Sequence, residues 1–206
     1  MIEGFHSGVD IHTVTASQVF SLPQDQVPPD LSRAAKAVNF GIVYGISAYS
    51  LSDDIHVTVA QAKEYMEKYF EHYSGVRSYM DRVVERGRGD GCVSTMYGRR
   101  RWLPELKSSH FNTRSFGERV ALNMPIQGTA ADIIKLAMIR VDGRLRAEGL
   151  EARLVLQVHD ELIVECPEGE AEQVKALLQK EMEGVAALSV PLLADAKAGR
   201  TWAETH

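Results

Sequence analysis

Apolar side chains recur at helical spacing through most of the chain. This spacing predicts helices over residues 10–20, 30–45, 59–73, 76–88, 113–148 and 170–184. Pro125 removes a backbone donor inside the longest of these segments and Gly128 weakens it, so we expect two helices that meet at a bend there. The pattern therefore predicts a mostly helical protein.

Two stretches show the composition of strands instead. VSTMYGRRRWL, at 93–103, predicts two short strands around a Tyr-Gly turn, and ARLVLQVHDELIVEC predicts an antiparallel hairpin over 152–166. A further short strand is expected over 190–196. Helices combined with antiparallel strands indicate an α+β fold.

Composition fits a globular protein of 206 residues, with 45% hydrophobic and 25% charged residues. No apolar run reaches the ~18 residues of a membrane span, and the first residues lack the features of a secretory signal. We therefore expect a cytoplasmic protein that does not contact a membrane. Cys92 and Cys166 form no CxxC pair, which favours reduced thiols over a zinc site or a disulfide.

The net charge of −5 conceals an uneven distribution. Residues 77–119 carry 5 more basic than acidic side chains, whereas the segments before and after them each carry 5 more acidic ones. A basic band between acidic flanks suits a protein that holds a polyanion in one place and a divalent cation in another. Ordinary scatter of charge remains the alternative.

The segment 30–45 has two opposed helical faces. One is an apolar stripe that needs a core, and the other carries Arg33, Lys36, Phe40 and Tyr44, with cations first and rings after. Cations near a helix N-terminus favour phosphate, and rings further along offer flat surfaces to a base or sugar. A surface helix whose rings pack under a neighbour explains the spacing about as well.

KAVNFGIVYG, from Lys36 to Gly45, is similar to the motif K-x-x-N-F-G-x-x-Y-G of family A DNA polymerases, the bacterial DNA polymerase I type. The resemblance implies that Lys36 binds the incoming triphosphate and takes part in catalysis, that Phe40 packs on the sugar, and that Tyr44 occupies the template-base position. Ser32 stands where the family usually has arginine, and the adjacent Arg33 is a candidate substitute.

DIHTVTA, from residue 10 to 16, resembles another stretch of the same family. The resemblance implies that His12 contacts the triphosphate. Without the motif at 36–45, a surface histidine near a helix cap would be the better interpretation.

The hairpin tip places Asp160 and Glu161 where two strands reverse direction. Carboxylates at a rigid turn can hold a hard cation such as Mg²⁺, although a solvated turn explains them equally well. QVHDE is similar to the family's catalytic hairpin, which implies that Asp160 binds metal, that Glu161 is catalytic and that His159 contacts DNA. Two Mg²⁺ ions are implied for a complete enzyme.

Two further groups of polar side chains indicate a role in DNA binding. Arg119, Asn123 and Gln127 recur every four residues, NMPIQGTAAD resembles the family at that place, and donors of this kind suit the minor-groove acceptors. YGRRR indicates a clamp on the phosphate backbone formed by Arg99, Arg100 and Arg101. A solvated polar face and a solvated charge run are the alternatives.

The resemblance implies a DNA-directed DNA polymerase whose residues 1–121 form the fingers and whose residues 122–206 form the C-terminal part of the palm. The family's other catalytic aspartate lies in a motif resembling D-Y-S-Q-I-E-L-R, which this sequence lacks. We therefore expect an inactive fragment that needs an upstream segment or partner chain, besides primer-template DNA and dNTP.

Two other functions remain open. A noncatalytic module would capture nucleotide or DNA through its basic residues. A metal-dependent nuclease would use the HDE turn.

Overall fold

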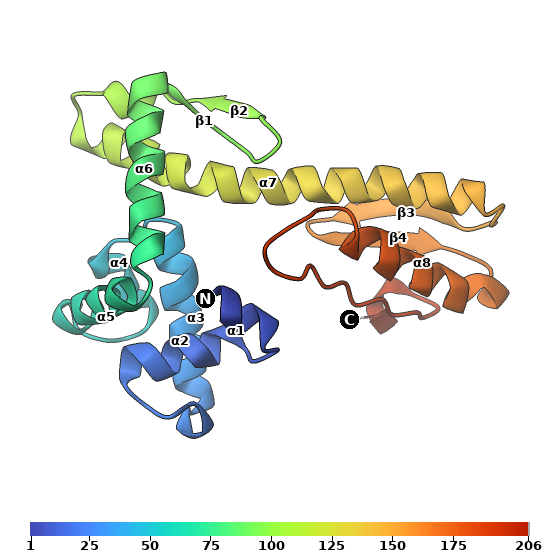
Figure 1. Cartoon of the computed structure of the whole chain (residues 1–206), viewed down its shortest axis with the longest axis horizontal. Helices are drawn as coiled ribbons and strands as arrows, with labels where there is room; N and C mark the ends of the chain where they lie inside the picture. The colour runs from blue at the N-terminus through green and yellow to red at the C-terminus, as the bar shows by residue number, and fades with distance from the viewer. Residues whose placement is uncertain (206) are drawn as a thin grey trace. The chain divides into compact units, whose positions relative to one another are not determined.

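The computed structural model describes residues 1–205 and is mostly helical, with two small antiparallel sheets (Figure 1). This confirms the predicted α+β class. Its elements are α1 (Ile2–His6), α2 (Ile11–Phe20), η1 (Gln24–Gln26), α3 (Pro29–Val43), α4 (Ala48–Asp54), α5 (Val59–His72), α6 (Ser74–Asp90), β1 (Cys92–Ser94), β2 (Arg100–Trp102), η2 (Pro104–Lys107), α7 (Phe111–Ala147), β3 (Arg153–Val158), β4 (Glu161–Glu165), η3 (Glu168–Glu170), α8 (Ala171–Glu183) and η4 (Trp202–Thr205).

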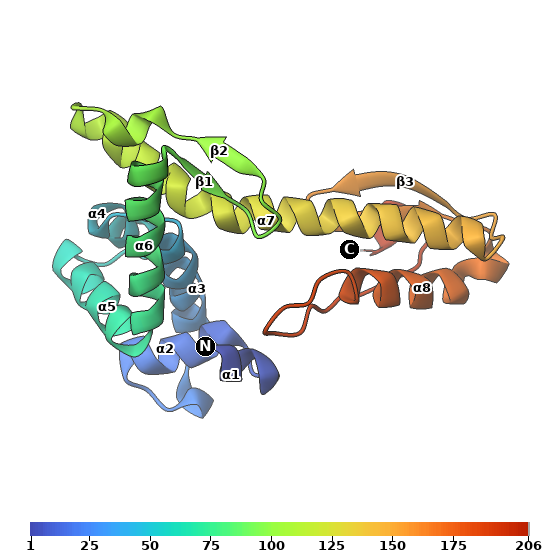
Figure 2. The ribbon, with the colours of Figure 1, turned by 45° about the horizontal axis from the view of Figure 1, so that its top comes forward.

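The chain forms two compact units, Met1–Gly128 and Thr129–His206. Helices α2 to α5 enclose the main core of the first unit, and α2 crosses α3 (Figure 2). Val38 and Ile42 of the predicted apolar stripe of α3 belong to this core, and Ala35 of the same stripe is buried as well; each is at most 1% exposed. The opposite face of α3 is thereby left for other tasks.

Gly45 ends α3 in a left-handed conformation, with φ of +75°. A side chain would be strained there, and a Cβ would lie 3.0 Å from Cδ1 of Leu122 on α7. The glycine therefore allows the C-terminal end of α3 to pack closely against α7.

Tyr69 is the largest fully buried side chain of the first unit's core. Its hydroxyl has no hydrogen-bond partner among residues 1–205. Burial, reinforced by the neighbouring Tyr73, raises the pKa of Tyr69 to about 12. An unpaired buried hydroxyl costs stability, so its removal should be tolerated.

We expect Tyr69→Phe to be at least as stable as the parent at neutral pH and more resistant to alkali. In the unfolded chain the phenol ionises near pH 10, whereas the folded chain keeps its proton until the pKa of about 12 is reached. The parent should therefore lose about 2 kcal/mol relative to Tyr69→Phe as the pH rises from 10 to 12. Urea unfolding at stepped pH measures this, and parallel curves for the two proteins would contradict it.

Strands β1 and β2 pair in antiparallel register, Val93 opposite Arg101, as the sequence predicted. The buried Thr95 hydroxyl accepts hydrogen bonds from the backbone amides of Tyr97 and Arg99, each at 3.2 Å. Gly98 completes the turn with φ of +81°. The turn is thus held from inside, while its arginines remain outside.

The bend expected at Pro125 is wrong as a break between helices, because α7 is one helix from Phe111 to Ala147 with Pro125 inside it. Gly128 is explained by packing rather than by flexibility. A Cβ there would lie only 2.7 Å from Cγ2 of Thr95, so the glycine allows the β1–β2 turn to pack on α7.

Gly128→Ala should therefore destabilise the protein by about 1 to 3 kcal/mol through overpacking, although alanine favours helix. Gly143→Ala is the matched control, since Gly143 lies in the same helix and a Cβ there meets nothing within 4 Å. That control should gain about 0.5 to 1 kcal/mol. Urea unfolding distinguishes the two, and equal stabilisation would refute the packing argument.

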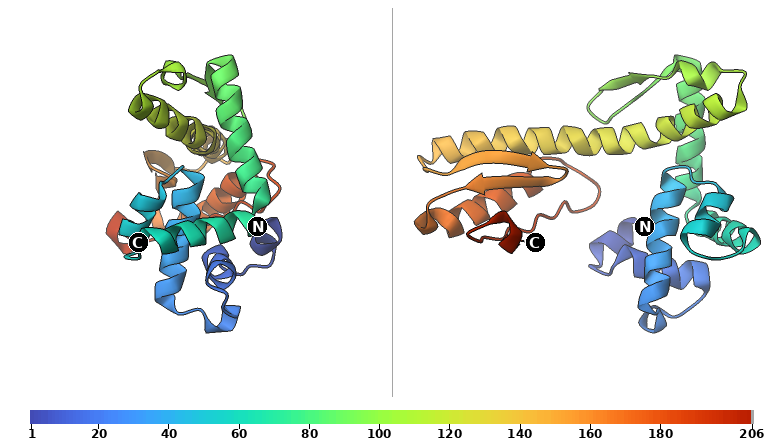
Figure 3. Two further views of the ribbon diagram at one scale, coloured as in Figure 1. Left: turned by 90° about the vertical axis from the view of Figure 1, so that its left-hand side faces the viewer. Right: turned by 180° about the vertical axis from the view of Figure 1, so that it is seen from behind.

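In the second unit, the β3–β4 hairpin and α8 run alongside the C-terminal half of α7 (Figure 3). Val141, Leu145, Val174 and Leu177 form their shared core with side chains of β4. The strands pair from Arg153 opposite Glu165 to the tip, with an irregularity between residues 154 and 156. This confirms the predicted hairpin.

The strand expected over 190–196 is wrong, because these residues form neither helix nor strand. Side chains of α8 bind this backbone instead. The Gln179 amide donates to the Ala194 carbonyl at 3.0 Å, and the Ala194 amide donates to Glu183 at 3.1 Å. The apolar pattern thus fits a segment that lies beside a helix as well as it fits a strand.

Candidate functional site

The polar face of α3 carries a row of one cation and two rings, Lys36, Phe40 and Tyr44. Lys36 is exposed, Phe40 is 47% exposed and Tyr44 is partly buried, and the two rings lie 6.2 Å apart. The alternative that neighbours bury both rings therefore fails for Phe40. Arg33, at the start of the row, forms an exposed ion pair with Asp30, a contact that contributes little stability.

Helix α2 brings His12 to this row. Its ring centre lies 5.7 Å from that of Phe40. Asp10 caps α2 by accepting hydrogen bonds from the backbone amides of His12 and Thr13, at 3.3 and 3.0 Å. Partial burial opposes ionisation of this carboxyl, but the hydrogen bonds from Thr13 and His12 outweigh it and hold the pKa of Asp10 below its ordinary value.

Ser32, which stands where the resemblance expects arginine, takes part in the same capping group. Its hydroxyl donates to Asp10 at 3.5 Å, so it joins the start of α3 to the cap of α2. A serine there ties two helices together, but it brings no charge to the row.

Asn39 was missed as a site residue by sequence reasoning, although it lies inside the motif at 36–45. Its amide nitrogen lies 3.1 Å from Nδ1 of His12 and 3.1 Å from the Thr15 hydroxyl. No local sequence pattern predicts these two contacts, because His12 and Thr15 lie 27 and 24 residues away from Asn39.

Arg119, Asn123 and Gln127 lie in the first unit, on α7 beside the end of α3. A Cβ on Gly45 would lie 3.5 Å from Cγ of Arg119. The Arg119 guanidinium donates to Ser115 at 3.1 Å, and Gln127 is exposed. The Asn123 side-chain oxygen is buried and has no partner within residues 1–205. The predicted minor-groove row therefore differs in exposure from one member to the next.

The basic turn is exposed throughout. Arg99, Arg100 and Arg101 are all accessible, and the neighbouring Met96 and Tyr97 are 68% and 47% exposed. Cations and a ring on a rigid turn suit contacts to a phosphate backbone.

The tip of the β3–β4 hairpin carries the acidic candidates. His159 adopts φ of +51°, Asp160 is exposed and Glu161 is partly buried opposite Val158. No group of three metal-ligating side chains occurs within residues 1–205. A single carboxylate suits Mg²⁺, which keeps several waters and takes substrate phosphates as ligands.

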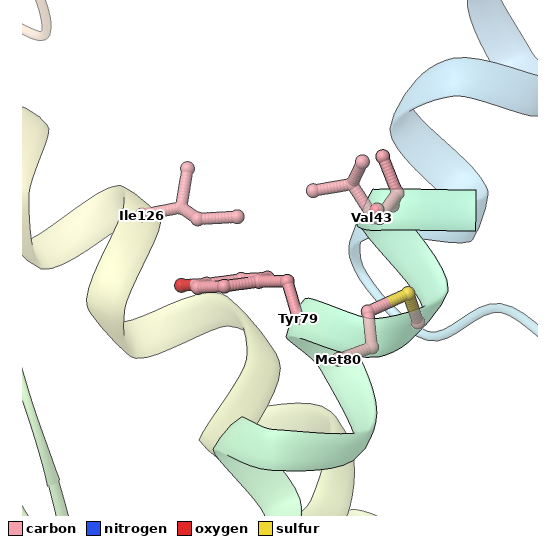
Figure 4. Close-up of a pocket in the computed structure, with 6 residues that line it drawn as sticks. Val43, Tyr79, Met80 and Ile126 are labelled. Carbon is pink, nitrogen blue, oxygen red and sulfur yellow. The ribbon is translucent and has the colours of Figure 1, made fainter. Parts of the chain in front are cut away.

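A cavity of about 260 Å³ lies in the first unit between α3, α6 and α7 (Figure 4). Val43, Tyr79, Met80 and Ile126 are among its lining residues, and burial raises the pKa of Tyr79. Its walls are almost entirely apolar, so it offers nothing to a phosphate.

Two further features bear on the expectations from composition. Cys92 and Cys166 are both free. No helix within residues 1–205 is both long enough and apolar enough to cross a membrane.

Comparison with known proteins gives consistent matches along the chain. The family described as DNA polymerase family A matches residues 1–204. DNA polymerase I of Bacillus caldotenax is 50% identical over 202 residues, which are 98% of this chain and 23% of that protein. DNA polymerase I of Streptococcus pneumoniae serotype 4 is 48% identical over 205 residues, 99% of this chain and 23% of that protein.

Among solved structures, the POL domain of Pol1 from M. smegmatis, in complex with DNA primer-template and dNTP, matches with a TM-score of 0.94 and 47% identity. The match covers 99% of this chain and 36% of that one. The chain thus spans about a quarter of the length of the relatives it matches.

Proposed function

This chain belongs to DNA polymerase family A, and from that membership we propose that it supplies the nucleotide-binding part and one catalytic carboxylate for template-directed DNA synthesis. The reaction is transfer of a nucleotide from dNTP to a primer 3′-hydroxyl. Residues 1–121 act as the fingers and residues 122–206 as the C-terminal part of the palm.

The exposed row on α3 is the observation that carries this proposal. Lys36 binds the triphosphate as a full positive charge, with His12 and Arg33 as further phosphate ligands. Phe40 contacts the sugar and Tyr44 lies at the template base. Lys36 and Phe40 are both exposed, so a single nucleotide can contact the cation and the ring together.

Asp160 at the hairpin tip is the proposed metal ligand, with Glu161 beside it. Mg²⁺, when bound, activates the primer hydroxyl and steadies the triphosphate. Asp160 contributes one carboxylate in a rigid position. The other aspartate is proposed to come from a polypeptide that precedes this segment in the complete enzyme.

The DNA itself is held by side chains of both units. Arg99, Arg100 and Arg101 bind the phosphate backbone without regard to sequence. Arg119, Asn123 and Gln127 of the first unit contact minor-groove acceptors, which are alike in all base pairs. His159 of the second unit is a separate contact to the primer-template.

Complementation tests this function. The chain is mixed with an upstream polypeptide that carries the D-Y-S-Q-I-E-L-R motif, and primer extension is followed on a gel. We expect extension only when both polypeptides, dNTP and Mg²⁺ are present. Extension by the upstream polypeptide alone, or none with a mixture shown to associate, would refute the proposal.

The exposed basic turn favours one other function, capture of DNA by the chain alone. That function predicts appreciable DNA affinity without a partner, falling steeply between 50 and 200 mM salt. Titration of the isolated chain with primer-template at both salt concentrations separates the two, since a catalytic half that depends on its partner should bind weakly at either.

A further inference from the structure

Asn39 links the two helices that carry the proposed triphosphate ligands. It lies on α3 immediately before Phe40, and its side chain is partly buried against α2. The amide nitrogen lies 3.1 Å from Nδ1 of His12, the ring nitrogen that faces α3.

The Asn39 amide also contacts a buried hydroxyl. Thr15 is fully buried, and its Oγ1 lies 3.1 Å from the Asn39 nitrogen and 3.2 Å from the Asn39 oxygen. The same Oγ1 lies 3.4 Å from the Tyr73 hydroxyl, in the junction between α5 and α6. Contacts through Thr15 and Asn39 therefore connect Tyr73 in the core with His12 at the proposed nucleotide site.

The donor character of the amide decides the state of the ring. Because an amide N–H donates, the His12 nitrogen that it faces must accept, and the proton of the neutral ring then resides on Nε2. We infer that Asn39 is a positioning residue that holds neutral His12 in the Nε2–H tautomer. The ring thereby presents an N–H donor away from α3.

This tautomer is the useful one if His12 binds phosphate, a role that rests on the proposed function. Phosphate oxygens only accept, so a neutral histidine contributes to their binding through an N–H and not through a bare nitrogen. The ring is also held in place beside Phe40, at a centre-to-centre distance of 5.7 Å. Asn39 would thus act on the nucleotide without touching it.

Nitrogen NMR of the intact chain tests the tautomer directly. The protein is labelled with ¹⁵N-histidine, spectra that connect ring protons to ring nitrogens are recorded at pH 8.5, and His12→Ala identifies the His12 signals among the 7 histidines. We expect His12 to be the Nε2–H tautomer. An Nδ1–H ring, or an even mixture, in the unaltered protein would overturn the inference without recourse to any variant.

Asn39→Asp sharpens the test, because a carboxylate accepts and cannot donate. The proton of His12 should move to Nδ1 in this variant, an effect that a loss of packing would not produce. Asn112→Asp is the matched control, since Asn112 is exposed at the start of α7. It should leave the His12 signals unchanged, and an unmoved proton in Asn39→Asp would count against the inference.

Affinity for magnesium tripolyphosphate, measured by calorimetry, separates the positioning role from the function it rests on. Asn39→Ala and His12→Ala should each weaken binding about 10-fold, the effect of one hydrogen bond to a charged group. The double variant should be no weaker than His12→Ala, and additive losses would contradict action through His12. If the tautomer behaves as expected but all three bind like the parent, Asn39 keeps its positioning role and the phosphate role of His12 fails.

Discussion

Asp160→Ala is expected to lower Mg²⁺-dependent primer extension by about 10³-fold or more in the complemented mixture, because a metal's charge stabilisation is worth several kcal/mol. Asp160 lies exposed at a two-residue turn, so its removal should leave folding intact. Initial rates of extension at saturating dNTP measure the effect, with thermal unfolding recorded on the same samples.

Asp195→Ala is the matched control for this variant. Asp195 is another exposed aspartate of the second unit, and its ion pair with Lys197 is a long contact of 3.9 Å. The same loss of charge there should leave extension unchanged. Extension that survives Asp160→Ala would remove the hairpin from the catalytic mechanism, whatever the rest of the chain does.

Lys36→Ala should raise the dNTP concentration needed for half-maximal extension by roughly 10- to 100-fold, the effect of losing one charged hydrogen-bond donor to phosphate. Lys36 is exposed and forms no ion pair within residues 1–205, so nothing structural is lost with it. Steady-state extension over a range of dNTP concentrations gives the value.

Two substitutions accompany Lys36→Ala. Lys36→Arg keeps the charge and should retain most of the affinity, while Lys63→Ala removes another exposed lysine, from α5, and should have no effect. If Lys63→Ala weakens dNTP binding as much as Lys36→Ala, dNTP is attracted by positive charge in general, and the row on α3 has no special role in binding.

The elements that the sequence predicted correctly are those in which local pattern and packing agree. The apolar stripe of α3 is buried at Ala35, Val38 and Ile42, and Gly45 ends the helix with a positive φ. The β3–β4 hairpin follows equally from two β-branched runs around a short turn. Both depend on residues close together in the chain.

The errors arise where distant residues decide the structure. From the sequence, Gly128 is expected to weaken the helix. In the structure Thr95 occupies the space that a side chain at Gly128 would fill. The segment at 190–196 has the composition of a strand, but α8 supplies its hydrogen bonds. Neither partner can be identified from spacing along one sequence.

The candidate site also has residues that the sequence identified and contacts that only the fold revealed. The resemblance supplied Lys36, Phe40 and Tyr44 because they share one motif. The exposure of Phe40 and the contact between Asn39 and His12 required the fold, since α2 and α3 are joined by a loop and cross in space. A motif therefore indicates candidate site residues, but it does not indicate the contacts that position them.

The two cysteines fall one in each compact unit, Cys92 in the first and Cys166 in the second. Nitroxide labels on these native thiols would report the distance between the units by pulsed electron paramagnetic resonance, without the introduction of further cysteines. Burial, together with the nearby Glu170, raises the pKa of the Cys166 thiol, so alkaline conditions favour its modification. The same pair of labels can then register any change in separation when primer-template and dNTP are added.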